Sequence, residues 1–300
     1  MKGRVRLEAR TLRLALLHQT KGASRVLLRQ FLQFDPSLEF VFSLSSKELT
    51  SNFKLSPKRA STFLTHLHSD SNRKQLLTNL SECDLMPFWH PNYPSSLRSI
   101  PDAPLLLYAK GDVKLLGKNS YLSIVGTRKC SNLALASVKK VLPPLLNEEF
   151  VIVSGMAEGI DSFAHELTEE LGGKTIAILG FGFQYCYPKA NKRLMETLAH
   201  KHLLLSEYAP HIPPRKWHFP ERNRIISGLS FGTLVVEAKE RSGTLITVDQ
   251  ALEQGREVFA IPGSILDDFS GGCNKMIQDG AKLVQNAYDI VEEWEVQKRK

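Results

Sequence analysis

Apolar residues recur every three or four positions across residues 1–80, which is the period of amphipathic helices. Gly22 interrupts the first pair of helical stretches. Further along, Ser56 and Pro57 suit the N-cap and the first position of a later helix. We therefore predict a small all-helical domain of short helical hairpins over residues 1–80.

The pattern changes over residues 84–118 to proline, aromatic residues and short apolar runs. Met86-Pro-Phe-Trp-His-Pro-Asn-Tyr-Pro94 is followed by Pro104-Leu-Leu-Leu-Tyr108. Because flexible linkers are rarely so aromatic, we predict an ordered connector with one or two short strands.

From residue 119 to residue 300, short β-rich runs alternate with helical stretches. The candidate strands are residues 121–125, 150–153, 175–179, 202–205, 233–236, 257–261 and 281–284. Most are apolar on both faces, as expected of parallel strands that are covered by helices on each side. The pattern predicts an α/β fold, a doubly wound (Rossmann-like) parallel sheet preceded by the small all-helical domain.

Composition adds a charge asymmetry to this picture. The 300 residues are 42% hydrophobic and 23% charged, which is typical of a globular protein with about two domains. Residues 1–118 hold 18 basic and 9 acidic side chains, and residues 119–300 hold 21 and 22, so the net charges are +9 and −1. The asymmetry suggests a polyanionic partner such as nucleic acid or a membrane surface, although a solvated basic face without a partner fits the charge equally well.

Several classes of site and compartment are disfavoured. The four cysteines at positions 83, 130, 186 and 273 form no C-x-x-C pair, which argues against a zinc site and a secreted disulfide scaffold and favours the cytoplasm. No apolar run approaches the roughly 20 residues that span a bilayer, and the basic start lacks a signal-peptide core. Two histidine pairs, at 66 and 68 and at 200 and 202, lack a second cluster. We expect no metal, no cofactor and no membrane segment.

The turns after the predicted strands are rich in glycine and serine. They are residues 126–128, 154–161, 180–183, 206–207, 242–244 and 262–264. In a doubly wound sheet, ligands bind outside the carboxyl ends of the strands, and glycine turns that lead into helices favour anions. A single glycine there is explained by a tight turn, but the repetition along one edge favours a phosphate-binding site.

The first of these turns does not carry a dinucleotide fingerprint. Residues 125–130 lack the second and third glycines of G-x-G-x-x-G, and no G-x-x-x-x-G-K-[ST] occurs in the chain. Arg128 instead offers a two-pronged donor for a phosphate. The alternative is a surface arginine that pairs with a nearby carboxylate.

A second candidate feature combines basic and aromatic residues. Residues 211–224 place four basic side chains beside Trp217 and Phe219, and Tyr185, Tyr187 and Lys189 follow the third strand in a similar way. Grooves for single-stranded nucleic acid use aromatic faces for bases and cations for phosphates. Alternatively, Trp217 and Phe219 only anchor a long loop to the sheet.

These motifs resemble the DNA-processing protein A family (DprA, also called Smf). The matching strings are Ile124-Val-Gly-Thr-Arg128, Val153-Ser-Gly-Met-Ala-Glu-Gly-Ile-Asp161, Tyr187-Pro-Lys-Ala-Asn191, Phe219-Pro-Glu-Arg-Asn-Arg-Ile-Ile-Ser227, Ser242-Gly-Thr-Leu-Ile-Thr247 and Val258-Phe-Ala-Ile-Pro-Gly263. The resemblance covers residues 84–292 closely and the helical start loosely, where it suggests a sterile-alpha-motif-like domain that extends the DNA path.

The resemblance implies a non-enzymatic mediator of natural transformation. Such a protein binds and protects incoming single-stranded DNA, dimerises, loads the RecA recombinase and opposes displacement by single-strand-binding protein. It also implies that Arg128 grips the DNA backbone. The predicted nucleic-acid-binding residues are Gly126, Thr127, Arg128, Ser154, Gly155, Gly159, Phe183, Tyr187, Lys189, Asn191, Arg222, Asn223, Arg224, Ser242, Gly243 and Thr244.

The chain departs from the family pattern in two places. Near Ser131 the family often carries a Tyr-Gly pair, whereas this chain reads Ser131-Asn132-Leu133. Many members also have a C-terminal winged-helix domain, and we expect none in this sequence. We further predict dimerisation through the terminal strand, with Ile277 and Leu283 at the interface, because an exposed strand edge needs cover.

Two other classes of function compete with this interpretation. The first is a nucleotide N-glycosidase of the lysine-decarboxylase-like phosphoribohydrolase type, whose turn carries a catalytic glutamate. Thr247 occupies the corresponding position here, which leaves the acid/base role unfilled. The second is a scaffold that binds only protein, which leaves the glycine-rich edge and the basic-aromatic segment unexplained.

Overall fold

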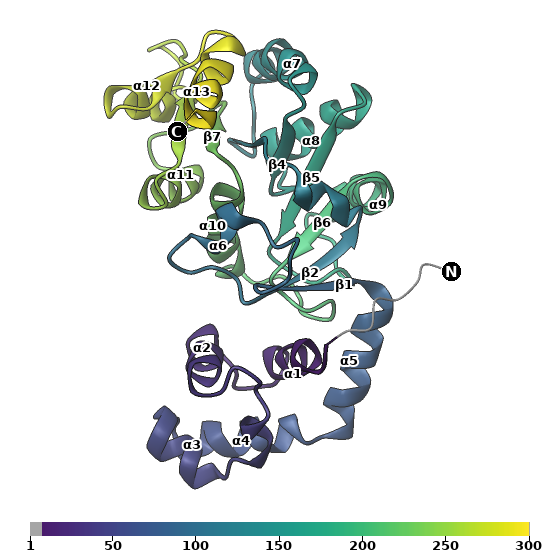
Figure 1. Ribbon diagram of the computed structural model, residues 1–300. Coiled ribbons are helices and arrows are strands. Elements are labelled where there is room, and N and C mark those ends of the chain that lie inside the picture. Colours follow the sequence, from purple (N-terminus) through teal and green to yellow (C-terminus); the bar gives the residue numbers. More distant parts are fainter. Residues whose placement is uncertain (1–7, 300) are drawn as a thin grey trace. The chain divides into compact units, whose positions relative to one another are not determined.

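We describe residues 8–299 of the computed structural model of the protein (Figure 1). The chain divides into two compact units, one of Met1–Pro91 with Leu105–Tyr108 and one of Asn92–Pro104 with Ala109–Lys300. Residues 105–108 thus belong to the first unit although they follow part of the second. The three-part division into residues 1–80, 84–118 and 119–300 stays a prediction.

The first unit is mainly helical. Its elements are α1 (Ala9–His18), α2 (Arg25–Phe34), a 3-10 turn η1 (Phe40–Ser43), α3 (Ser46–Phe53), α4 (Pro57–Leu67), α5 (Asp70–Glu82) and the short strand β1 (Asp84–Pro87). Ser56 caps α4, and Pro57 is its first residue, as predicted. Serine side chains also cap α2, α3 and α5, each accepting a hydrogen bond from a backbone N–H of the first turn.

The core of the first unit combines aromatic packing with a closed polar network. The Phe31 ring lies 4.8 Å from that of Phe53 and 5.9 Å from that of Phe63, centroid to centroid. Gln19 donates to the side-chain oxygen of Asn72 at 2.7 Å and accepts from the side chain of Asn79 at 2.7 Å. These buried amides are paired, so they stabilise one packing arrangement of α1 against α5.

The second unit contains the sheet. Its elements are α6 (Ser95–Arg98), β2 (Leu106–Gly111, which begins in the first unit), η2 (Val113–Gly117), β3 (Tyr121–Val125), α7 (Asn132–Asn147), β4 (Val151–Ser154), α8 (Ile160–Glu170), β5 (Lys174–Leu179), η3 (Lys189–Asn191), α9 (Lys192–Lys201), β6 (Leu203–Ser206), α10 (His218–Leu229), β7 (Gly232–Val235), α11 (Thr244–Glu253), β8 (Glu257–Ala260), α12 (Gly271–Gln278), β9 (Lys282–Leu283) and α13 (Tyr288–Lys298). Strands β3 to β9 pair in parallel in the order β6-β5-β4-β3-β7-β8-β9.

The strand order runs outward in both directions from β3, so β3 lies at the switch point of a doubly wound sheet. All seven predicted strands occur, and the predicted fold class is confirmed. Strand β9 is shorter than predicted and lies at one edge, paired only with β8 among these seven strands.

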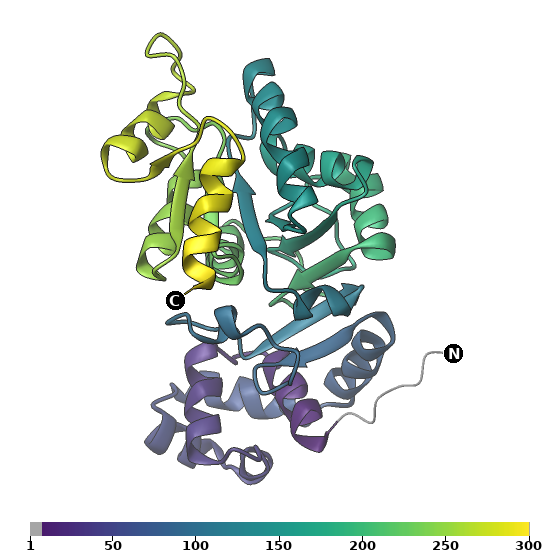
Figure 2. The ribbon, with the colours of Figure 1, turned by 45° about the horizontal axis from the view of Figure 1, so that its top comes forward.

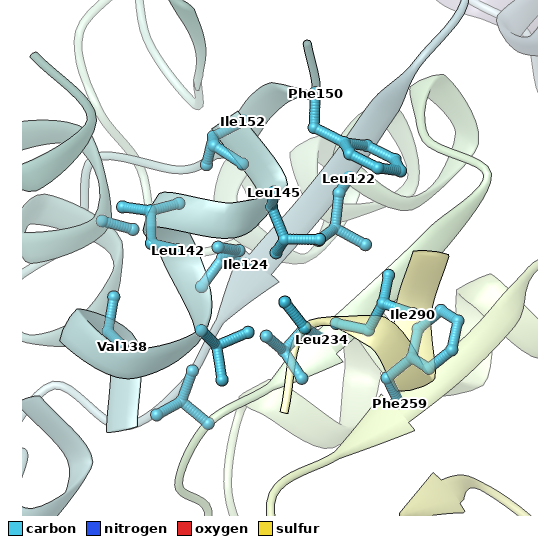
Figure 3. Packing of buried hydrophobic residues seen from close by; sticks show 14 of the residues in the cluster. Leu122, Ile124, Val138, Leu142, Leu145, Phe150, Ile152, Leu234, Phe259 and Ile290 are labelled. Carbon is cyan, nitrogen blue, oxygen red and sulfur yellow. The ribbon is translucent and has the colours of Figure 1, made fainter. Parts of the chain in front are cut away.

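Alternate residues of β3 serve opposite faces of the sheet. Leu122 and Ile124 belong to a buried apolar cluster with residues of α7 and α8 (Figure 3). Ser123, between them, is fully buried against α10, where its hydroxyl donates to the Ile226 carbonyl oxygen at 2.9 Å. Helices therefore cover both faces, which explains why the strands carry apolar residues on both faces.

Helix α13, yellow in Figure 2, completes the same cluster. The Trp294 ring lies 5.0 Å from the ring of Phe231 and 5.9 Å from that of Phe150. The last helix is thus part of the core of the second unit. None of the helices within residues 8–299 has the length and apolar character that crossing a membrane requires.

Candidate functional site

The turn after β3 is held from two sides. The backbone N–H of Thr127 donates to the carbonyl oxygen of Glu237, which follows β7, at 2.8 Å. The carbonyl oxygen of Thr127 accepts the backbone N–H of Ile160, the first residue of α8, at 3.2 Å. Gly159 has a φ of +81°, and a Cβ there would overlap the Thr127 carbonyl oxygen. Glycine at this position therefore permits the close approach of the turn and the helix start.

Arg128 projects from this fixed turn. Its side chain is exposed and makes no hydrogen bond or ion pair with any other residue in the range 8–299. The carboxylate of Glu237 instead accepts from the backbone N–H of Ser131 at 2.9 Å and from its hydroxyl at 2.5 Å. The guanidinium of Arg128 is thus accessible to an external anion, and its charge also acts on the buried carboxylate of Asp161, where it opposes the rise in pKa that burial causes. It forms no ion pair with that carboxylate, which disfavours the ion-pair alternative.

A buried charge pair lies next to this turn. Asp161, in the first turn of α8, accepts the backbone N–H of Gly155 at 3.1 Å, and the guanidinium of Arg222 donates to the carbonyl oxygens of Gly155 (2.5 Å) and Ile178. Burial raises the pKa of Asp161, against the opposing effect of Arg222. Burial also lowers the pKa of Arg222 to about 10, so the guanidinium keeps its charge at neutral pH.

Arg224 is likewise engaged inside the protein. Its Nη2 donates to both carboxylate oxygens of Glu207 at 2.8 and 2.7 Å, and its Nε donates to Asp102 at 3.1 Å. Asn223, between the two arginines, accepts a hydrogen bond from Arg222 Nε at 3.1 Å. Both guanidinium groups are buried and donate to protein acceptors, although Nη1 of Arg224 has no hydrogen-bond partner within residues 8–299. We therefore leave these two arginines out of the proposed contact set.

The loop after β5 brings further predicted residues toward the turn. The side chain of Asn191 donates to the carbonyl oxygen of Met156 at 3.0 Å, which ties this loop to the turn after β4. Tyr187 and Lys189 are exposed, and the Tyr187 ring lies 5.3 Å from that of Phe219. Phe183 is buried instead. An aromatic ring and a cation therefore accompany Asn191 on the outer side of this loop.

Trp217 adds a second exposed aromatic face. Its side chain is 57% exposed, and the Arg215 guanidinium lies 5.2 Å from its ring centre. Phe219 is half-buried next to Tyr187. The interpretation of Trp217 as a loop anchor is therefore disfavoured, whereas the half-buried Phe219 packs as a loop anchor does.

The remaining predicted residues are split between surface and interior. Ser154 is fully buried, and its hydroxyl donates to the Ile124 carbonyl oxygen at 2.6 Å. Ser242, Gly243 and Thr244 lead into α11 after β7, the neighbour of β3, and a Cβ on Gly243 would meet no atom within 4 Å. Gly126, by contrast, packs against Ile160, so its lack of a side chain is required.

Sequence reasoning missed the internal partners of this site. Glu237 and Asp161 were not among the predicted site residues, yet they fix the turns after β3 and β4. The sequence could have indicated Glu237, because this carboxylate follows the buried apolar run of β7, at the edge of the sheet where ligands bind. Within residues 8–299, no group of three or more His, Cys, Asp or Glu side chains is placed to hold a metal ion.

The fold and the site define a doubly wound α/β protein with glycine turns and an exposed arginine at the carboxyl edge of its sheet, as in proteins that bind phosphate groups. A family model for DNA recombination-mediator protein A matches residues 84–295, and the chain belongs to this family. The resemblance inferred from the motifs is thereby confirmed.

Two relatives cover similar parts of the chain. DNA processing protein DprA of Streptococcus pneumoniae is 54% identical over 203 residues, 68% of this chain and 71% of the relative. DNA processing protein DprA of Bacillus subtilis is 49% identical over 208 residues, 69% of this chain and 70% of the relative.

Solved structures of two relatives are similar to this chain over most of its length. The X-ray structure of DprA from Streptococcus pneumoniae has a TM-score of 0.84 at 40% identity and covers 96% of this chain and 99% of that protein. The structure of DprA from Helicobacter pylori, which was described for its single-stranded DNA binding mode, has a TM-score of 0.64 at 28% identity. It covers 72% of this chain and 96% of that protein.

Proposed function

We propose that this chain is a recombination mediator of natural transformation that binds and protects incoming single-stranded DNA. Family membership and the single-stranded DNA binding of the Helicobacter pylori relative support this proposal. The observation that carries it is Arg128, an exposed guanidinium that makes no hydrogen bond or ion pair among residues 8–299, on a turn fixed by Glu237 and Gly159.

The proposed contacts divide between phosphates and bases. Arg128 and Lys189 are exposed cations that suit the DNA backbone. The exposed rings of Tyr187 and Trp217 suit the faces of unpaired bases, which a duplex hides. Further contacts come from Asn223 in α10 and from the segments that follow the strands, namely Gly126, Thr127, Gly159, Asn191, Ser242, Gly243 and Thr244. Ser154, Gly155 and Phe183 support these turns from the interior.

The proposed partners follow from the role of a mediator. We propose that the chain acts in the cytoplasm as a homodimer, loads RecA recombinase onto the bound strand and opposes its displacement by single-strand-binding protein. The edge position of β9 supports a two-fold pairing of protomers there, with Leu283 38% exposed and Ile277 half-buried.

We propose that the protein acts without catalysis. The position of the phosphoribohydrolase glutamate holds Thr247, which is buried in α11. Burial raises the pKa of the thiols of Cys130, Cys186 and Cys273, so these thiols are not activated nucleophiles. Incubation with nucleoside monophosphates should release no free base. A turnover that survives repurification and disappears with Glu237→Gln or Asp161→Asn would establish the N-glycosidase alternative instead.

One titration tests the DNA-binding proposal directly. Fluorescent oligothymidine and a duplex of the same length are titrated with the protein at two salt concentrations. We expect tighter binding of the single strand and a loss of affinity with salt, because phosphate contacts release counterions. Equal affinity for both forms, or binding that does not respond to salt, would contradict the proposal.

A further inference from the structure

A basic face lies on the first unit, where two helical turns meet. Residues 9–34 hold five lysine or arginine residues and residues 49–69 hold three, and neither segment contains an aspartate or a glutamate. The first segment comprises α1, α2 and the turn between them, and the second runs from within α3 to the end of α4. We define the basic face by four exposed cations from these segments, Lys21, Lys54, Lys58 and Arg59.

Contacts between the two turns bring these cations together. Arg59, in α4, donates from Nε to the carbonyl oxygen of Gly22, in the turn between α1 and α2, at 2.8 Å. The backbone N–H of Lys21 donates to Nδ1 of His66, also in α4, at 3.2 Å. A Cβ on Gly22 would lie 3.5 Å from the backbone carbonyl oxygen of Arg59. The neighbouring residues Lys21 and Lys58 therefore have Cα atoms at most about 15 Å apart.

No carboxylate within residues 8–299 pairs with the basic face. The ammonium groups of Lys21, Lys54 and Lys58 make no hydrogen bond or ion pair in this range. The acceptors of the Arg59 guanidinium, a carbonyl oxygen and a serine hydroxyl, are both neutral. The four positive charges are therefore not compensated by ion pairs in the folded protein.

The surface around these charges is polar. None of the large apolar side chains that are exposed within residues 8–299 lies in α3 or α4. Ser61, Thr62 and Thr65 are exposed along α4 instead. Hydroxyl groups of this kind contact the phosphates and sugars of DNA without reading its sequence.

The chemistry of the basic face narrows the choice of partner. Protein partners are held mainly by apolar and aromatic anchors, and single-stranded nucleic acid by aromatic rings that stack on its bases. The basic face offers neither. Its cations suit phosphates, and duplex DNA carries a phosphate charge about every 1.7 Å along its axis, twice the density of a single strand. The duplex also hides its base faces, so the lack of aromatic rings costs nothing there.

We propose that the basic face binds the phosphate backbone of double-stranded DNA, at a site separate from the single-strand site of the second unit. This inference goes beyond the proposed function, which concerns a single strand. A chain with both sites holds an incoming strand and a duplex at the same time. Because the duplex contacts are limited to phosphates, the duplex binds more weakly than the single strand and without sequence preference.

Fluorescence anisotropy with a labelled duplex of about 20 base pairs tests the proposal on the full-length chain. Lys21→Gln/Lys58→Gln removes two of the four charges. The duplex affinity should fall by about tenfold, and the slope of log affinity against log salt should flatten by about 1.8, which is about 0.9 for each lost phosphate contact. The affinity for oligothymidine of the same length should change by less than about twofold. The melting temperature should remain nearly unchanged, because both lysines are exposed.

The matched control is Lys47→Gln/Lys74→Gln, which removes the same charge from exposed positions of α3 and α5 outside the basic face. The proposal is overturned if this control weakens duplex binding as much as Lys21→Gln/Lys58→Gln does, or if the latter leaves duplex binding unchanged. Binding of the wild type to phosphatidylglycerol vesicles and not to the duplex would assign the face to a membrane surface and would also overturn the proposal.

Simultaneous occupancy gives a second readout. Wild-type protein saturated with unlabelled oligothymidine should still bind the labelled duplex, with an affinity lowered by less than about threefold. Complete displacement of the duplex would place both forms of DNA at one site and contradict the proposal.

Arg128→Ala separates this proposal from the proposed function. It should weaken oligothymidine binding and leave duplex binding within about twofold, and an equal loss for both would overturn the separate site. If the wild type binds oligothymidine and not the duplex, the basic-face proposal alone fails. If it binds the duplex alone, the proposed function fails and the basic face stands. If it binds neither, both fail.

Discussion

Gly159 lies so close to Thr127 that no side-chain atom fits between its Cα and the Thr127 carbonyl oxygen. The contact joins the start of α8 to the turn that carries Arg128. Any residue with a Cβ has to displace that turn or remain out of place itself, and the φ of +81° adds backbone strain to the steric conflict.

Gly159→Ala should therefore destabilise the protein and impair DNA binding together. The backbone at φ +81° and ψ −127° is nearly restricted to glycine and costs another residue about 1–3 kcal/mol, and overpacking adds about 1–3 kcal/mol. Gly172→Ala is the matched control, since Gly172 has a φ of +73° with open space around its Cβ position. Thermal unfolding should show the larger loss for Gly159→Ala, and equal losses would contradict the close contact.

Arg128→Ala should weaken single-stranded DNA binding at least tenfold. A guanidinium on a phosphate contributes about 1.5–3 kcal/mol, and the loss of one contact flattens the salt slope by about 0.7. The melting temperature should remain nearly unchanged, because Arg128 is exposed and has no partner among residues 8–299. Unchanged affinity would contradict the site assignment, and a large loss of stability would restore the ion-pair interpretation.

Arg222→Met should have the opposite profile. It removes the cation that most strongly opposes the raised pKa of the buried Asp161 carboxyl, and it removes donors from the Gly155 and Ile178 carbonyl oxygens. Loss of one partner of a buried pair costs about 3–5 kcal/mol, which urea unfolding can measure. A stable Arg222→Met variant with weak DNA binding would return Arg222 to the contact set.

His165 should make stability depend on pH. It is fully buried in α8, with Nδ1 2.7 Å from the Thr175 hydroxyl, and burial lowers its pKa to about 3 from an ordinary 6.5. The unfolded chain therefore binds the proton first as the pH falls. The contribution of the neutral ring is complete above the unfolded pKa and declines below it, by about 2 kcal/mol at pH 5.

Urea unfolding at pH 7 and pH 5 measures this loss. His165→Asn should reduce the difference between the two pH values, whatever its own stability at pH 7. Burial also lowers the pKa of His202 and His218, so part of the wild-type pH dependence should persist in the variant. An identical pH dependence in wild type and variant would show that His165 does not contribute.

A charge at the edge strand should separate the proposed dimer. Leu283→Asp and Ile277→Asp place a carboxylate at or beside β9, and a buried unpaired charge is costly at an interface. Light scattering should give the mass of one chain for either variant and of two chains for the wild type. Leu171→Asp, at a 45% exposed position after α8, serves as control. A monomeric wild type across micromolar concentrations would count against the dimer.

The sheet was predictable because its strands are apolar at nearly every position, as β3 illustrates over Tyr121–Val125. The basic segment over residues 211–224 was only partly predictable. The many charged residues of this segment gave no sign of the helix that begins at His218, in which Arg222 and Arg224 are buried. The sequence alone does not distinguish these two buried arginines from the exposed Arg128. Only the fold shows that Asp161 lies near Arg222 and that Glu207 binds Arg224. The DNA contacts themselves stay a prediction.

The exposure of Arg128 on a fixed turn has a kinetic consequence. A phosphate that reaches Arg128 has no hydrogen bond or ion pair to break with any residue in the range 8–299, and the backbone of the turn is already fixed on both sides. Capture of the strand at this position then needs no conformational step, so its rate is set by diffusion and by electrostatic attraction. Salt should accordingly slow the arrival of DNA at this turn.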